Sequence, residues 1–66
     1  MNRRLVLEAF EVTREENGTT KRQVTSGTVL NILQWLRPGE ARFTVEGEGC
    51  EVWVCDDPQI KKATVP

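Results

Sequence analysis

One stretch near the middle of the chain has its apolar residues at the spacing of a helix. They stand at i, i+3, i+4 and i+7, the stripe of a helix that buries one side: Val29, Ile32, Leu33 and Leu36. Ser26 is the favoured N-cap among the hydroxyl residues before the stretch. Pro38 and Gly39 end the helix, because proline cannot continue it. We therefore predict a helix over about residues 27–37, too short to be stable without packing on another element.

The residues before this helix have the composition of a β-hairpin. A strand over about residues 3–13 is rich in branched and aromatic side chains. Both of its faces are partly apolar. Either both faces are covered, or a bulge near Glu8 and Ala9 switches the inward face. A returning strand over about residues 19–25 is almost entirely polar, which is typical of a sheet edge.

The turn between these two strands favours one register. Asn17-Gly18 accepts the positive φ angles of a tight hairpin. A two-residue loop would set two basic side chains opposite one another, which is unfavourable. A three-residue loop avoids this and pairs Phe10 with Val24 and Val12 with Arg22.

A second hairpin is predicted after the helix, around a glycine-rich turn. Its strands alternate cleanly between apolar and polar positions: residues 41–46 and 50–55. Pairing Val45 with Cys50 joins the two apolar rows into one. The same register places Trp53 on the opposite face, beside Arg42.

The tail, residues 56–66, has two interpretations. Asp57 can cap a helical turn over residues 59–63, with Pro58 at its first position. Alternatively, residues 60–65 add a short edge strand.

This order of elements predicts a single α+β domain over residues 1–66. One helix packs on a four-stranded, mostly antiparallel sheet in a two-layer ββαββ arrangement, or on five strands if the tail adds one. Over residues 3–55 this order resembles the β-grasp domains, especially the compact immunoglobulin-binding domains of bacterial surface proteins. Small phage-encoded anti-CRISPR proteins are similar in size and element order.

Charge is uneven along the chain, although the net charge is −1. Residues 40–57 contain six acidic side chains and one basic, a local net of −5. The chain therefore lacks the overall basic field that concentrates nucleic acid. No apolar run approaches the roughly 18 residues that a membrane span needs. We expect a cytoplasmic protein.

The residues that usually carry chemistry are scarce. On one straight strand Cys50 and Cys55 would lie roughly 16 Å apart, well beyond the ~7 Å limit for the Cα atoms of a disulfide. We expect free thiols in a reducing compartment, with the pKa of Cys55 raised by the carboxylates beside it. The chain has neither histidine nor tyrosine. We predict no enzyme, no metal and no cofactor.

The leading functional hypothesis is a protein-binding module that presents the second hairpin. Tryptophan and arginine are common at interface hot spots, and the acidic surroundings suit a basic partner. Such a partner would be a nucleic-acid-binding protein, and the chain would block its basic site in the way of an anti-CRISPR-like inhibitor. Alternatively, Trp53 is covered by the tail and Trp35 lies at the core margin. The proposed contact residues are Trp53, Arg42, Glu51, Glu46, Glu48 and Trp35.

Two other functions stay open. The chain could bind nucleic acid directly through the basic side chains of the first hairpin: Arg14, Lys21 and Arg22. It could also be a structural subunit that pairs its sheet edges in a homo-oligomer or larger assembly. The hydroxyls and glycine of residues 25–28 could hold an anion at the helix start, but helix capping explains them as well.

Overall fold

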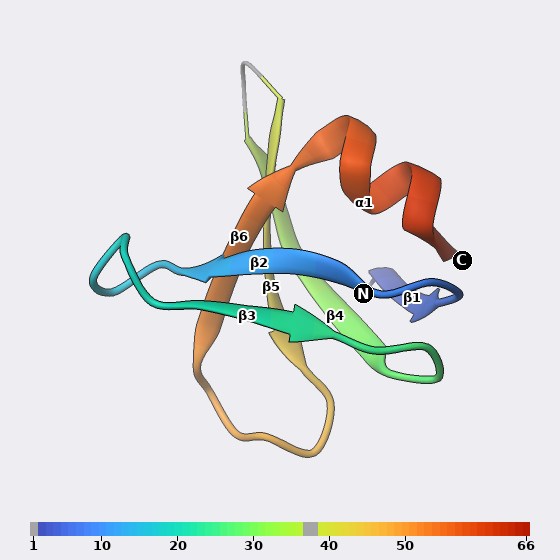
Figure 1. Ribbon diagram of the computed structural model, residues 1–66, viewed down its shortest axis with the longest axis horizontal. Helices are drawn as coiled ribbons and strands as arrows, with labels where there is room; N and C mark the ends of the chain where they lie inside the picture. Colours follow the sequence, from blue (N-terminus) through green and yellow to red (C-terminus); the bar gives the residue numbers. More distant parts are fainter. Residues whose placement is uncertain (1, 37–38) are drawn as a thin grey trace.

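The structure is a computed structural model and describes residues 2–36 and 39–66 (Figure 1). In these residues the chain forms seven strands and one short helix. They are β1 (Asn2–Val6), β2 (Phe10–Arg14), β3 (Lys21–Val24), β4 (Val29–Leu36), β5 (Glu40–Val45), β6 (Val52–Asp56), α1 (Asp57–Ala63) and β7 (Thr64–Val65).

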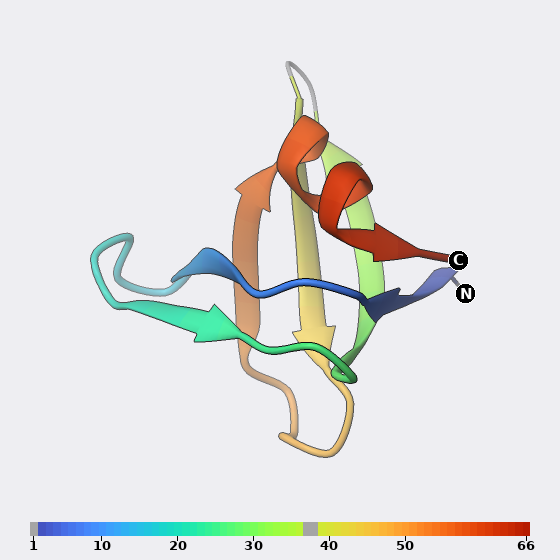
Figure 2. The ribbon, with the colours of Figure 1, turned by 45° about the vertical axis from the view of Figure 1, so that its right-hand side comes forward.

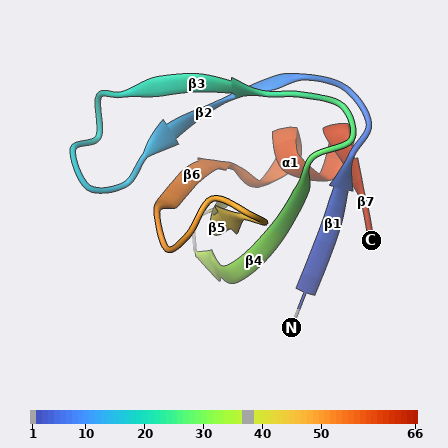
Figure 3. The same cartoon turned by 90° about the horizontal axis from the view of Figure 1, so that it is seen from below.

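All seven strands belong to one antiparallel sheet, in the order β3-β2-β6-β5-β4-β1-β7. Strands β4, β5 and β6 run side by side, and α1 lies above their upper ends (Figure 2). The segment 2–14 carries both β1, which pairs with β4, and β2, which pairs with β6. Its two halves thus flank both sides of the β4–β6 unit, and the sheet curls into a half-barrel (Figure 3).

The predicted two-layer ββαββ domain is therefore wrong. Strands account for 56% of the residues and helix for 11%, and the helix follows the last long strand. No helix separates the two hairpins within the described residues. The element order behind the likeness to β-grasp domains and small anti-CRISPR proteins is not the order of this chain.

The central stretch is strand β4, and its helical spacing has another cause. Leu30 and Ile32 point into the core at 0% and 5% exposure. The pairing with β5 shifts between Ile32 and Gln34, and Leu33 is exposed at this irregularity. An irregular strand therefore imitates the i, i+3, i+4 spacing, while branched residues favour the extended chain.

The residue predicted to begin that helix has another role. Ser26 lies in a turn in which the Thr28 N–H donates to the Thr25 carbonyl (3.1 Å), and Gly27 has φ +92°. A glycine tolerates this angle, so the turn replaces the predicted cap. Pro38 lies outside the described residues.

The first segment keeps a single inward face. The chain leaves the sheet at residues 7–9, yet Val6, Phe10 and Val12 are all buried. Leu5 and Leu7 are exposed at 40% and 53%. The inward face therefore does not switch, and the outer face is left uncovered at Leu5 and Leu7.

The register of the first hairpin is as predicted. Phe10 pairs with Val24 and Val12 with Arg22. The Asn17 side-chain oxygen accepts hydrogen bonds from the N–H groups of Thr19 and Thr20, both at 3.0 Å. The turn is therefore held by its own side chain.

The predicted register of the second hairpin is wrong by one residue. Phe43 pairs with Trp53 and Thr44 with Val52, across a loop that occupies residues 46–51. A shift of one residue moves every side chain of a strand to the other face. Trp53 is therefore in the core, at 4% exposure.

The tail combines both of its predicted forms, a helix followed by a strand. Asp56, not Asp57, occupies the N-cap position. Ile60 and Ala63 are fully buried against the end of the barrel. The Thr64 hydroxyl donates to the Ile60 carbonyl (2.6 Å) and accepts a hydrogen bond from Arg4 Nε (2.6 Å). The helix thus closes one end of the core.

The core lies inside the curl of the sheet. It consists of Val6, Phe10, Val12, Val24, Leu30, Ile32, Ala41, Phe43, Val45, Trp53, Ile60 and Ala63. Among the described residues, no helix has the length and apolarity that crossing a membrane requires.

Candidate functional site

The tryptophan proposed as the centre of a partner-binding hairpin belongs to the core. Trp53 is 4% exposed and pairs with Phe43. The guanidinium carbon of Arg22 lies 5.2 Å from its ring centroid, within cation–π range. The prediction of an exposed Trp53 is therefore wrong, because the indole lies in the core.

The three acids in the loop of the second hairpin, residues 46–51, each meet an arginine from elsewhere in the sheet. Glu46 pairs with Arg3 at 2.8 Å, Glu48 with Arg22, and Glu51 with Arg14 at 3.0 Å. These three pairs neutralise the acids that were expected to attract a basic partner. We refer to the loop 46–51 with its three arginine partners, Arg3, Arg14 and Arg22, as the paired-charge end of the molecule.

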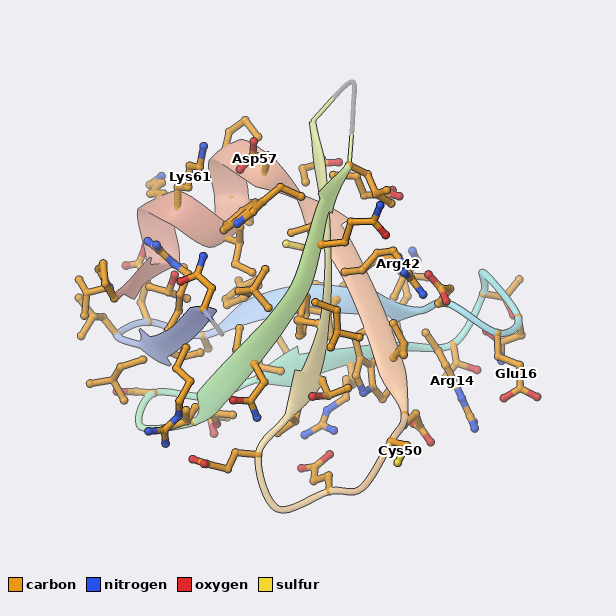
Figure 4. All side chains as sticks on the ribbon, turned by 180° about the vertical axis from the view of Figure 1, so that it is seen from behind. Arg14, Glu16, Arg42, Cys50, Asp57 and Lys61 are labelled. Atoms are coloured by element: carbon orange, nitrogen blue, oxygen red, sulfur yellow. The ribbon has the colours of Figure 1, made fainter. Side chains whose placement is uncertain are left out.

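Arg42 is held in the same way. It forms two hydrogen bonds with the Glu15 carboxylate and donates to the Gln34 side-chain oxygen at 3.0 Å. Hydrogen bonding from Arg42 lowers the pKa of Glu15 below its usual value and raises that of Arg42. In Figure 4, Arg42 points from β5 toward the first hairpin, where Arg14 and Glu16 lie. The charge of Arg42 is therefore paired with Glu15 inside the protein.

Trp35 lies at the margin of the core, as the alternative interpretation had it. It is half-buried and packs against the core residues. The ammonium of Lys61 lies 5.2 Å from its ring centroid and 3.3 Å from Asp57 Oδ1. Figure 4 shows Lys61 and Asp57 on α1, above this part of the sheet. Trp35 therefore helps to seat the helix.

The basic residues proposed for nucleic acid are not gathered into one free surface. Arg14 lies 3.3 Å from Glu16 and 3.0 Å from Glu51. Arg22 is bound to Glu48, and this hydrogen bond lowers the pKa of Glu48. Lys21 donates to the Thr13 hydroxyl at 3.1 Å and lines a groove with acidic walls.

This groove has a volume of about 620 Å³ and lies between the first hairpin and the end of β6. One wall is the outer face of β2 and β3, and the other is the end of β6 with the start of β5 and α1. Polar walls surround a more apolar floor. The walls are Glu11, Thr13, Lys21, Gln23, Glu40, Val54, Asp56 and Gln59, and the floor is Ala9, Phe10 and Cys55.

The groove exists because β2 and β6 separate. Their ladder contains two pairs, Thr13 with Val54 and Arg14 with Trp53. Beyond Thr13 the strands diverge, so the next outward-facing residues, Glu11 and Asp56, stand on opposite sides of the gap. The groove therefore lies at the open end of this ladder, away from the hairpin tips.

Three carboxylates line the groove, one on the β2 wall and two on the wall of β5 and β6. Glu40 pairs directly with Asp56, and Glu11 with Gln23. Two acids directly opposed on neighbouring strands repel each other. Among residues 2–36 and 39–66, no basic side chain lies within ion-pair distance of Glu11, Glu40 or Asp56. Here the acidic charge faces solvent.

Cys55 in the groove floor is not suited to act as a nucleophile. Burial and, to a smaller extent, the Asp56 carboxylate together raise the pKa of its thiol to about 12, while a hydrogen bond from the Ile60 backbone opposes this. The direction agrees with the expectation from the flanking acids. The thiol is therefore protonated near neutral pH. Cys50 lies exposed in the loop 46–51, and both cysteines are free.

Other chemistry finds little support in the groove. Within the described ranges, no group of three acidic or cysteine side chains has the arrangement of a metal site. The sequence contained part of the signal for the groove, because Glu40 and Asp56 belong to the acidic stretch 40–57. Glu11 was missed, since only the pairing of β2 with β6 brings it near the other two.

The chain matches no protein-family model, no curated protein and no solved structure, so these comparisons associate it with no family or function.

Proposed function

We propose that the chain is a small non-catalytic binding module that takes a basic segment of a partner protein into the groove between β2–β3 and the end of β6. One observation carries the proposal. The carboxylates of Glu11, Glu40 and Asp56 line the groove with no cation of the described chain to neutralise them.

The groove suits a lysine or arginine side chain in two respects. Its volume of about 620 Å³ is within the range of ligand sites. Its accessible apolar residues, Ala9 and Val54, together with Cys55, can cover the aliphatic stem of such a side chain while the charged end meets the carboxylates. Even with Lys21 counted, the groove has a net charge of −2.

The partner would be a protein with lysine and arginine on an exposed segment, as nucleic-acid-binding proteins have. A module that covers such a segment would inhibit nucleic-acid binding by the partner. In this role the chain would be an inhibitor encoded by a phage or another mobile element. Two free thiols fit the reducing cytoplasm as its compartment.

Direct nucleic-acid binding is less well supported, because Arg14 and Arg22 already hold carboxylates. Self-association through the sheet edges is the other alternative. Leu5 and Val65 pair on β1 and the edge strand β7, and their exposures are 40% and 37%. Sedimentation of the free chain tests this alternative.

A titration with labelled peptides tests the proposal. The protein is added to a fluorescent peptide with several lysines and arginines, to its acidic counterpart, and to a single-stranded oligonucleotide. We expect saturable binding of the basic peptide, weakened by added salt because the contact is between charges.

A matched pair of variants locates the binding site. The triple variant E11Q/E40Q/D56N removes the groove carboxylates, and E8Q/E16Q/E46Q makes the same change in net charge elsewhere. We expect the groove variant to lose peptide binding and the control to retain it. Equal losses in both variants, or binding of the oligonucleotide instead of the peptide, would overturn the proposal.

A further inference from the structure

The carboxylates of the groove stand on both of its walls. Glu11 projects from β2 on one side of the gap, and Asp56 with its cross-strand neighbour Glu40 from β6 and β5 on the other. The diverging strands leave the space between them open. A cation in the groove thus has acceptors on two sides.

From this arrangement we infer that the groove selects arginine over lysine in the bound segment. The inference rests on the proposed function and specifies its ligand. It depends on the division of acceptors between two walls as well as on their charge.

The difference between the two cations lies in the geometry of their donors. A guanidinium is planar and has five N–H donors spread over its edges, and it can form paired hydrogen bonds with a carboxylate. It can therefore contact Glu11 on one wall and Asp56 on the other at the same time. An ammonium is a compact, strongly hydrated point charge with three donors, so it gives up more hydration for fewer well-aligned contacts.

The other groove residues agree with a guanidinium as ligand. Gln23 and Gln59 add side-chain oxygens that accept hydrogen bonds. The protonated Cys55 thiol adds no charge that would distinguish the two cations.

The test uses three peptides that share one neutral sequence and differ at a central residue: arginine, lysine or the uncharged analogue citrulline. Calorimetric titration at low ionic strength measures each affinity. We expect the arginine peptide to bind about tenfold more tightly than the lysine peptide, because it gains charge-assisted hydrogen bonds. We expect no measurable binding of the citrulline peptide.

The variant Glu11→Gln sharpens the test, since Glu11 is the carboxylate of the β2 wall. Without it all of the groove's carboxylates lie on one wall, and the affinity ratio of arginine to lysine should fall toward one. Glu8→Gln, which removes an exposed acid outside the groove, should leave the ratio unchanged. A thermal melt of each variant confirms that the fold is intact.

The outcomes separate the inference from the proposed function. Equal affinity of the intact protein for the arginine and lysine peptides overturns the arginine preference and leaves the basic-segment module standing. An unchanged ratio in Glu11→Gln also overturns the inference, because the second wall then has no part in the selection. If neither charged peptide binds, and the peptide with several lysines and arginines does not bind either, then both the arginine preference and the proposed function are wrong.

Discussion

The paired-charge end and the groove end of the molecule hold their acids in opposite ways. At the paired-charge end, Glu46, Glu48 and Glu51 each meet an arginine from elsewhere in the sheet. At the groove end, Glu40 and Asp56 face one another. All five acids come from the same short acidic part of the sequence. Their availability to a partner therefore depends on the strands that lie beside them, and net charge along the sequence does not reveal it.

The geometry of the ladder explains this contrast. Where β2 and β6 pair, Arg14 lies opposite Trp53 and the Glu15 N–H donates to the Val52 carbonyl at 3.0 Å. This pairing brings Arg14 of the first hairpin to 3.0 Å from Glu51, and Arg22 on β3 reaches Glu48. The arginine that meets Glu46 is Arg3, which comes from β1 beside β4. Where the strands diverge, the wall of β2 contributes Glu11 instead of a cation. The four predictions below test this contrast.

The largest effect is expected from Trp53→Ala, at the point where the ladder is closed. The substitution removes a buried indole that pairs with Phe43 and lies beneath Arg22. Large-to-small changes of this kind cost about 3–5 kcal/mol. A chain of this size has a total stability of the order of 3–10 kcal/mol, so much of the protein should unfold.

Urea unfolding followed by circular dichroism measures this loss. Trp35→Ala is the internal control, since Trp35 is half-buried at the core margin and should cost less. An unchanged midpoint for Trp53→Ala would mean that the indole is not part of the core. The paired-charge end would then have no rigid support.

The registers of the two hairpins show where sequence reasoning succeeds. Asn17 and Gly18 form a short turn with its own hydrogen bonds, and a short turn leaves one favourable pairing. The loop at residues 46–51 is longer, and Gly47 and Gly49 both have positive φ. Several registers are compatible with such a loop. Burial of one large indole, which simple alternation does not weigh against two valines, then decides between them.

The groove and the central strand required information that local patterns lack. The apolar spacing around Ile32 fits a helix as well as a strand with an irregularity, and the shift at Ile32–Gln34 becomes visible only in the pairing with β5. The acidity of Glu40 and Asp56 was evident in the sequence. Their position across the groove from Glu11 follows from the pairing of β2 with β6, strands about forty positions apart, which the periodicity of one segment cannot predict.

The second effect is a loss of stability in acid. The pKa values of Glu15 and Glu48 are lowered in the folded protein by hydrogen bonds from Arg42 and Arg22. A carboxyl whose folded pKa is depressed contributes stability above its unfolded value, near 4.5, and loses it as the pH falls through the folded value. The melting temperature should therefore fall as the pH decreases below about 4.5.

Thermal melts between pH 7 and pH 2.5 measure this dependence. The variant E15Q/E48Q lacks both groups and should show a weaker fall over the same range. High salt should also reduce the difference between the two proteins, because these pairs are exposed. Identical pH profiles for the parent and the variant would contradict the stabilising role of the two pairs.

The third effect is that of a single pair. Glu48→Gln should lower the free energy of unfolding by less than about 1 kcal/mol, since the Glu48 side chain is 46% exposed and solvent screens its pairing. Arg22→Gln should cost more, because Arg22 also covers the Trp53 ring. A double-mutant cycle of the two changes isolates their coupling. A coupling of zero would show that Glu48 does not interact with Arg22 in solution.

The smallest effect should have the opposite sign. Glu40→Gln removes the same charge as Glu48→Gln, but it relieves repulsion from Asp56 directly across the strands. Relief of a directly opposed like-charge pair is worth a few tenths of a kcal/mol, so the melting temperature should rise by about 1–2 °C for a domain of this size. Differential scanning calorimetry resolves such a shift. The double variant E40Q/D56N should be little more stable than the single variant, because one neutral partner already removes the repulsion. A fall in stability for Glu40→Gln equal to that for Glu48→Gln would mean that the groove acids are as well paired as those at the hairpin tips, and the contrast between the two ends would be lost.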